Sequence, residues 1–181
     1  VMQEALTYMQ THLASFALVV PKGTFAPYSL QNNQQTPYPL TREEALQCLV
    51  SQLAATDIVV ATTGKTSREL YEYRTALGQS HECDFLTVGS MGHASQIALG
   101  IALAKPHCNV YCFDGDGALL MHLGGMAIIG SQMLPNYKHI VFNNGAHDAV
   151  GGQPTVGHLI DIPAIAKACG YQTVLQAHSK E

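Results

Sequence analysis

From residue 41 onward, short and continuously apolar runs alternate with segments in which apolar residues recur at helical spacing. Strands that are apolar throughout are buried on both faces, and strands that alternate with helices pair in parallel. We therefore predict a doubly wound α/β fold, with a mostly parallel sheet and helices on both faces. The predicted strands are 57–61, 85–88, 109–113, 139–142 and 171–175, and the predicted helices are 41–54, 67–77, 94–104, 123–133 and 163–169.

The first forty residues follow a different pattern. Apolar residues at helical intervals predict a helix over 1–15, and 16–20 is expected to be a buried strand. Residues 21–40 contain four prolines together with several Asn and Gln, a composition that suits neither a helix nor a central strand. We predict that 1–40 forms a helix, a strand and an interdomain linker, and that 41–181 forms the main domain.

Composition excludes several classes of partner. Charged residues make up only 12% of the 181 residues, and the net charge is −4 without any basic run, so we expect no nucleic-acid partner. No apolar stretch reaches the roughly 18 residues of a bilayer span, so we expect no membrane partner. The five cysteines form no CxxC pair, which disfavours a disulfide framework and a zinc site and suits a cytoplasmic location. Apolar, Ala- and Gly-rich helices with so little charge predict a homo-oligomer.

Four polar loops follow predicted strands, at 62–67, 89–93, 114–117 and 143–148. The carboxyl ends of parallel strands meet at one edge of the sheet, where ligands of such folds bind. Spacing excludes two nucleotide motifs there. A P-loop needs a glycine five positions before Gly64, where Val59 stands, and a dinucleotide fingerprint needs one at Leu120.

Asp116 stands between two glycines, where an acid would repel a phosphate unless a cation intervenes. Together with Asn143 at the end of the next strand it supplies hard oxygen ligands, which suit Mg²⁺ that also binds phosphate oxygens. Glycine-rich turns that enter helices offer backbone N–H groups and a positive dipole end to the same anion. The residues therefore predict a site for magnesium and phosphate.

Gly115, Asp116 and Gly117, with Asn143 and Asn144 beginning 27 residues after the aspartate, resemble the motif of thiamine-diphosphate-dependent decarboxylases related to pyruvate decarboxylase. Over 62–155 the likeness is greatest to phosphonopyruvate decarboxylases, and next to sulfopyruvate decarboxylases. The resemblance implies that the chain is the domain that binds the diphosphate of the cofactor in a thiamine-diphosphate- and Mg²⁺-dependent enzyme. It also implies that this enzyme converts 3-phosphonopyruvate to phosphonoacetaldehyde and CO₂, in phosphonate biosynthesis. Sulfopyruvate as the substrate, or a non-catalytic α/β binding module, are the alternatives.

The resemblance also implies roles for individual residues. Asp116 and Asn143 would ligate Mg²⁺ through their side chains and Gly145 through its carbonyl. Gly89 would accept a hydrogen bond from the 4′-amino group of the cofactor, and Met91 would be the apolar wedge that bends it. The other implied cofactor-binding residues are Thr62, Thr63, Gly64, Ser90, Gly115, Gly117 and Ala118.

Residues beside the cofactor loops are candidates for contact with the substrate. His147 and Asp148 follow the metal loop and are the predicted catalytic residues, with His147 as a proton donor because an ordinary histidine has a pKa near 6.5. Lys65 could meet a phosphonate, and His93 is a further candidate. The alternative for His147 and Lys65 is that each is simply exposed to solvent. The alternative for His93 is a structural role at the start of a helix, with the hydrogen bonds of its ring already made.

Enzymes of this family need a glutamate that lies in a separate pyrimidine-binding domain. The glutamates of this chain fall in predicted helices, in a polar loop or at the terminus, where solvated positions explain them. We therefore expect the chain to be the carboxyl-terminal half of a decarboxylase or a small subunit, and its start at Val1 favours a fragment. The pyrimidine-binding domain, absent from this chain, would come from the same longer polypeptide or from another subunit, and the chain alone would be inactive.

Overall fold

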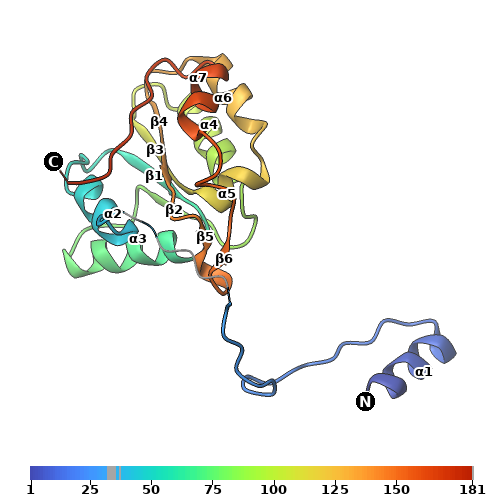
Figure 1. The fold of residues 1–181 in the computed structure, drawn as a ribbon. Coiled ribbons are helices and arrows are strands. Elements are labelled where there is room, and N and C mark those ends of the chain that lie inside the picture. The colour runs from blue at the N-terminus through green and yellow to red at the C-terminus, as the bar shows by residue number, and fades with distance from the viewer. Residues whose placement is uncertain (32–35, 37, 181) are drawn as a thin grey trace.

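The computed structural model of the chain describes residues 1–31, 36 and 38–180. Residues 32–35 and 37 of the predicted linker, and Glu181, lie outside this part. Figure 1 shows helix α1 (Met2–His12) apart from the body of the molecule, which holds the sheet and the other helices. The predicted N-terminal helix is therefore present, and it makes no layer of the body.

The body is built on a four-stranded sheet with the order β2-β1-β3-β4, in which every pair of neighbours is parallel. Parallel neighbours need a crossover, and a helix supplies each one (Figure 1). The predicted doubly wound α/β fold is confirmed. The strands are β1 (Ile58–Ala61), β2 (Asp84–Leu86), β3 (Val110–Gly115) and β4 (Tyr137–Phe142).

Helices cover both faces of this sheet because alternate side chains of β1 and β3 point to opposite faces. On one face, α2 (Arg42–Val50) and α3 (Lys65–Ala76) pack Leu46 and Leu70 against Val59 and Phe113. On the other face, three alanines of α4 (Ala94–Ala104), one turn apart, pack against Val60, Val110 and Cys112. The helices α5 (Asp116–Met121), α6 (Gly125–Gln132) and α7 (Ile162–Ala168) form a further apolar cluster beside β4.

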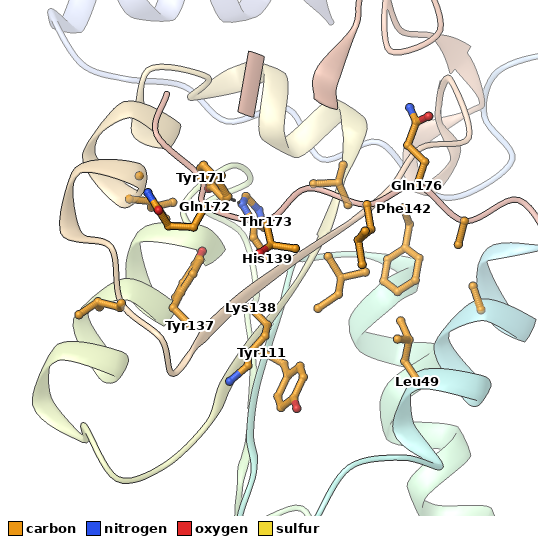
Figure 2. A pocket seen from close by; sticks show the side chains of 18 of the residues that line it. Leu49, Tyr111, Tyr137, Lys138, His139, Phe142, Tyr171, Gln172, Thr173 and Gln176 are labelled. Atoms are coloured by element: carbon orange, nitrogen blue, oxygen red, sulfur yellow. Dashed lines mark hydrogen bonds between the residues drawn. The ribbon is translucent and has the colours of Figure 1, made fainter. Parts of the chain in front are cut away.

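Two predicted strands are wrong. Residues 16–20 are irregular and exposed, and they run outside the body where no strand lies beside them to pair with. Residues 171–175 are also irregular, although they follow α7 as predicted. They and β4 line a common cavity of about 910 Å³ (Figure 2). No backbone hydrogen bond joins the two segments in the described chain.

Only the predicted helix 94–104 has its predicted bounds. The predicted helices 1–15, 67–77 and 163–169 correspond to α1, α3 and α7, with ends that differ by one to three residues. The predicted helix 41–54 ends at Val50. Turns follow it, because the Asp57 carboxylate accepts a hydrogen bond from the Ala54 N–H at 2.9 Å. The predicted helix 123–133 is shorter, and a separate helix, α5, precedes it. Asp116 is thus the first residue of a helix. No helix among the described residues has the length and apolarity needed to cross a bilayer.

The register of β3 and β4 positions the loops. Gly115 pairs with Phe142, so the chain leaves the two strands at the same level, through Asp116 and Asn143. After Asn143 the chain forms a hairpin of β5 (Ala146–His147) and β6 (Gln153–Pro154), with a short 3₁₀ helix, η1 (Asp148–Val150), between them. The predicted loops therefore meet at one edge of the sheet.

Candidate functional site

Asp116 and Asn143 converge beside Gly157. A Cβ atom at position 157 would lie 2.6 Å from Asp116 Oδ2 and 2.6 Å from Asn143 Oδ1. The two oxygens thus face a common space, which stays open because residue 157 is glycine. The sequence motifs did not point to Gly157, because it lies outside any helix or strand, 14 residues after Asn143.

Short hydrogen bonds fix these two side chains. The Thr155 hydroxyl donates to Asp116 Oδ2, and Asn143 Nδ2 donates to the Gly157 carbonyl at 2.7 Å. Asn143 Oδ1 borders the open space and also accepts a hydrogen bond from the Gly145 N–H at 3.2 Å. Asp116 is only 2% exposed, and among the described residues no cationic side chain lies within ion-pair distance of it. A buried carboxylate that shares a gap with an amide oxygen has the donor set that a hard divalent cation requires.

Gly117 brings the second, third and fourth loops together. A Cβ atom there would lie 2.6 Å from His147 Nδ1 and 3.3 Å from Met91 Cε. The histidine ring and the methionine methyl group therefore border the backbone of the Gly115–Gly117 turn, and a larger residue at 117 would displace the ring. This contact places the predicted proton donor and the predicted wedge at the same turn.

The first loop supplies polar groups that the protein itself leaves unused. Thr62 is buried, and its hydroxyl has no hydrogen-bond partner in the described chain. Thr63 Oγ1 accepts from the Gly89 N–H at 3.2 Å, which ties the first loop to the second. Helix α3 then begins after Gly64 (φ 99°) with no side chain capping its first N–H groups. An orphaned buried hydroxyl beside uncapped N–H groups suits an anion.

A cavity of about 270 Å³ lies where these loops meet. Gly89, Ser90, Asn143 and Gly145 are outside its lining, and the exposed His93 holds its Nδ1 3.2 Å from the Ser90 carbonyl instead. Lys65 lines the cavity, as does Arg42, which the sequence analysis missed. The predicted site residues that line it are Thr62, Thr63, Gly64, Met91, Gly115, Asp116, Gly117, Ala118, His147 and Asp148.

Asp148 bridges two cations on the wall of this cavity. Lys65 Nζ lies 2.8 Å from Asp148 Oδ1, and Arg42 Nη2 lies 3.1 Å from Asp148 Oδ2. The hydrogen bond from Lys65, followed by that from Arg42, lowers the pKa of Asp148 against the opposing effect of desolvation. The carboxyl group is therefore ionised at neutral pH, where it accepts hydrogen bonds and delivers no proton.

A second polar cluster lies on the face of β3 and β4 that α4 covers. Asp114 Oδ1 accepts from the Gly115 N–H at 3.0 Å, and Asp114 Oδ2 lies 3.3 Å from His139 Nε2. The other ring nitrogen of His139 lies 2.9 Å from the Tyr171 hydroxyl (Figure 2). Burial raises the pKa of Cys112 and of Tyr171, so both stay protonated. No loop motif predicted this cluster, because it forms only when β3 and β4 pair.

Known proteins resemble this chain in sequence and in fold. A phosphonopyruvate decarboxylase of Streptomyces viridochromogenes is 44% identical over 134 residues, which are 74% of this chain and 32% of that protein. The sulfopyruvate decarboxylase subunit beta of Methanocaldococcus jannaschii is 36% identical over 140 residues, 76% of this chain and 70% of that subunit. The chain thus spans about a third of the length of the phosphonopyruvate decarboxylases that it matches.

A solved structure supports the fold. Benzoylformate decarboxylase from Polynucleobacter necessarius aligns with a TM-score of 0.61 at 18% identity, over 86% of this chain and 31% of that one. The family model described as thiamine pyrophosphate enzyme, C-terminal TPP binding domain, matches residues 62–181. By this match the chain belongs to the family of thiamine pyrophosphate enzymes, as a C-terminal TPP binding domain.

Proposed function

We propose that the chain is the cofactor-binding part of a thiamine-diphosphate- and Mg²⁺-dependent decarboxylase that acts on 3-phosphonopyruvate. The observation that carries the proposal is the convergence of Asp116 Oδ2 and Asn143 Oδ1 on the space beside Gly157. The family match supports the cofactor, and the likeness to phosphonopyruvate decarboxylases supports the substrate.

Three residues would hold the metal ion: Asp116 and Asn143 through side-chain oxygens, and Gly145 through its carbonyl. The buried charge of Asp116 lacks a cationic partner among the described residues, and a divalent ion would supply one. Since Mg²⁺ retains ligand positions for phosphate oxygens, the same ion would tie the cofactor's diphosphate to this edge of the sheet.

The diphosphate would lie between the first and third loops. The unpartnered Thr62 hydroxyl, with Thr63 and Gly64, would contact it from one side, and the N–H groups of Gly117 and Ala118 from the other. When bound, thiamine diphosphate supplies the electron sink that decarboxylation of a 2-oxo acid requires. The protein's part is to fix the cofactor's position and to exclude water.

The second and fourth loops would act on the remainder of the cofactor and on the substrate. Met91 lies against the Gly117 turn, where its apolar side chain would bend the cofactor, and Gly89 would offer its carbonyl, with Ser90 between them. His147 borders the same turn and would deliver a proton to the substrate. Asp148 would remain charged and position the cations around it, because both of its oxygens are ion-paired.

Catalysis would need a pyrimidine-binding domain, which we propose comes from the same longer polypeptide or from a separate subunit. The likeness to a decarboxylase subunit named beta supports a separate subunit. The match to only about a third of a phosphonopyruvate decarboxylase supports a longer polypeptide. The chain alone would then bind the cofactor through its diphosphate end and release no CO₂.

Calorimetry tests the cofactor part of the proposal. Thiamine diphosphate titrated into the chain should bind with Mg²⁺ present and much more weakly with a chelator. The Asp116→Ala variant should lose the Mg²⁺-dependent part, whereas the exposed Glu72→Ala on α3 should retain it. Unchanged binding by Asp116→Ala would mean that the chain is an α/β module without the proposed metal site.

Sulfopyruvate is the second candidate substrate, because a sulfopyruvate decarboxylase subunit aligns over 70% of its own length. The chain joined with its pyrimidine-binding partner should release CO₂ from 3-phosphonopyruvate with a higher kcat/KM than from 3-sulfopyruvate. If kcat/KM is higher for 3-sulfopyruvate, then 3-sulfopyruvate is the substrate.

A further inference from the structure

Asp148 occupies an anion-binding arrangement built by the first residues of two helices. Arg42 begins α2 and Lys65 begins α3, and each contacts one oxygen of the carboxylate, at 3.1 and 2.8 Å. Two cations that converge on one small anion form a receptor for it, because each oxygen accepts a charge-assisted hydrogen bond. Here the chain's own carboxylate fills the receptor.

Arg42 stays in place without Asp148. Its Nε and Nη2 donate to the two carboxylate oxygens of Glu69 at 2.9 and 2.7 Å, and both side chains are largely buried. This bidentate pair raises the pKa of Arg42 and holds the plane of the guanidinium group. Arg42 would therefore still face the cavity if another anion took the place of the aspartate.

The contacts of Asp148 are suited to exchange. Its side chain is 36% exposed and that of Lys65 43%, and ion pairs this accessible contribute little to stability. Asp148 belongs to the short helix η1, which Gly145 (φ 66°), Gly151 (φ 127°) and Gly152 (φ 79°) flank. Lys65 forms its ion pair with Asp148 and with no other acid among the described residues. An anion of higher charge could thus replace the carboxylate.

The receptor opens into the cavity of the proposed reaction. Arg42, Lys65, Gly117 and His147 all line the cavity of about 270 Å³. His147 borders the Gly117 turn, and Asp148 is the next residue along the chain. A short acid whose reacting end lies at this turn could therefore extend a second anionic group to the two cations.

We propose that Arg42 and Lys65 bind the second anionic group of the substrate, a phosphonate or sulfonate on the carbon chain of a 2-oxo acid, and that Asp148 occupies this place until substrate binds. The inference rests on the proposed function and names the residues that select its substrate class. A tetrahedral group presents an oxygen to each cation, and a doubly charged phosphonate competes with the singly charged aspartate. A 2-oxo acid without a second anion would leave Asp148 where it is.

Calorimetry with two matched acids tests this inference on the chain saturated with Mg²⁺ and thiamine diphosphate. The probes are 3-phosphonopropionate, which has both anionic groups, and propionate, which lacks the phosphonate. Lys65→Met should weaken 3-phosphonopropionate about tenfold, since a charge-assisted hydrogen bond is lost, and should leave propionate unchanged. Lys105→Met, which removes an exposed lysine that does not line the cavity, is the control and should change neither.

Asp148→Asn should have the opposite sign. Removing the competing charge should tighten 3-phosphonopropionate by about threefold, because the phosphonate no longer displaces a charged partner of these exposed cations. If Asp148 were instead a binding or proton-donating group for the substrate, the variant would weaken the phosphonate acid. Weaker binding by Asp148→Asn, or unchanged binding by Lys65→Met, would overturn the inference.

The cofactor's diphosphate is the other phosphate-like group that Lys65 could bind. In that case Lys65→Met would weaken thiamine diphosphate and leave 3-phosphonopropionate unchanged, which would also overturn the inference. Failure of the proposed function gives a different result, since the unmodified chain would then show no Mg²⁺-dependent binding of thiamine diphosphate. If thiamine diphosphate binds normally and Lys65→Met leaves the affinity for 3-phosphonopropionate unchanged, the result contradicts this inference and not the proposed function.

Discussion

Asp114 and Asp116 are buried carboxylates two residues apart on the same chain segment, yet their surroundings differ. The oxygens of Asp114 face the Gly115 N–H and His139, inside a cluster that Tyr171 completes. Asp116 accepts from the Thr155 hydroxyl and shares an open space with Asn143. Both oxygens of the first carboxylate have partners in the protein, whereas the second also borders an open space, and this difference separates a structural group from the proposed metal ligand.

The cluster around Asp114 also brings potential metal-ligand atoms together. Cys112, Asp114 and His139 offer ligand atoms that all lie within 4.8 Å of one another. Hydrogen bonds within the cluster already use those of Asp114 and His139, and burial keeps the pKa of Cys112 high. The contrast predicts that variants of the two aspartates will fail in different assays.

Asp116→Asn should show the largest effect, on binding. It keeps the shape of the side chain and removes its charge, so affinity for thiamine diphosphate with Mg²⁺ should fall about 100-fold or more, because changes outside the ligand shell already cost 10- to 100-fold. Isothermal titration gives the number, and Asp114→Asn is the matched control. Equal losses of affinity in the two variants would remove the distinction between the aspartates.

Asp114→Ala should show its effect on stability. It leaves the partly buried Gly115 N–H and the buried His139 Nε2 without their partner, and unsatisfied buried groups cost about 1–3 kcal/mol each. We expect the free energy of unfolding in urea to drop by about 3 kcal/mol. Glu72→Ala, on an exposed face of α3, should be close to neutral. A stable Asp114→Ala protein would show that the cluster is dispensable.

Gly157→Ala tests the proposed cation site without replacing either aspartate. The added methyl group would lie 2.6 Å from Asp116 Oδ2 and Asn143 Oδ1, so it competes with a cation for the same space. Mg²⁺-dependent binding of the cofactor should weaken about tenfold, as expected when ligands move from their positions. Gly100→Ala on α4, where a Cβ meets nothing within 4 Å, should bind normally. Normal binding by Gly157→Ala would place the cation elsewhere.

Asp148 should give the smallest effect, through the pH dependence of stability. Its pKa is lowered in the folded chain, so its ion pairs stabilise the fold above the ordinary aspartate pKa of about 3.9, and the contribution vanishes as pH falls through the lowered value. Asp148→Asn should therefore be less stable by about 1 kcal/mol or less at pH 7. Urea denaturation should show this gap closing in acid. A gap that is constant with pH would contradict the ionised bridge.

Local patterns predicted the elements whose packing is encoded in their own residues. Helix α4 has the predicted bounds, because Ala94, Ala98 and Ala102 give one small, buried face. The segment 171–175 has a strand-like composition as well, but it pairs with no strand among the described residues, since a strand requires a neighbour that its own sequence does not specify.

The same limit explains the site. Asp116 and Asn143 were predictable because each follows a strand, and parallel pairing brings the ends of neighbouring strands together. Arg42 was not, because its place depends on how α2 packs on α3, where Glu69 holds it. Gly157 belongs to an irregular segment, and only the folded structure shows what its missing side chain leaves open.

The central claim is that Asp116 and Asn143 hold one divalent cation between them. A crystal structure of the chain with Mg²⁺ and thiamine diphosphate tests it directly. We predict a cation beside Gly157 at about 2.0–2.1 Å from an oxygen of each side chain. A cofactor whose cation is bound elsewhere, with Asp116 still bonded to Thr155 and Asn143 still bonded to Gly145 and Gly157, would contradict the claim.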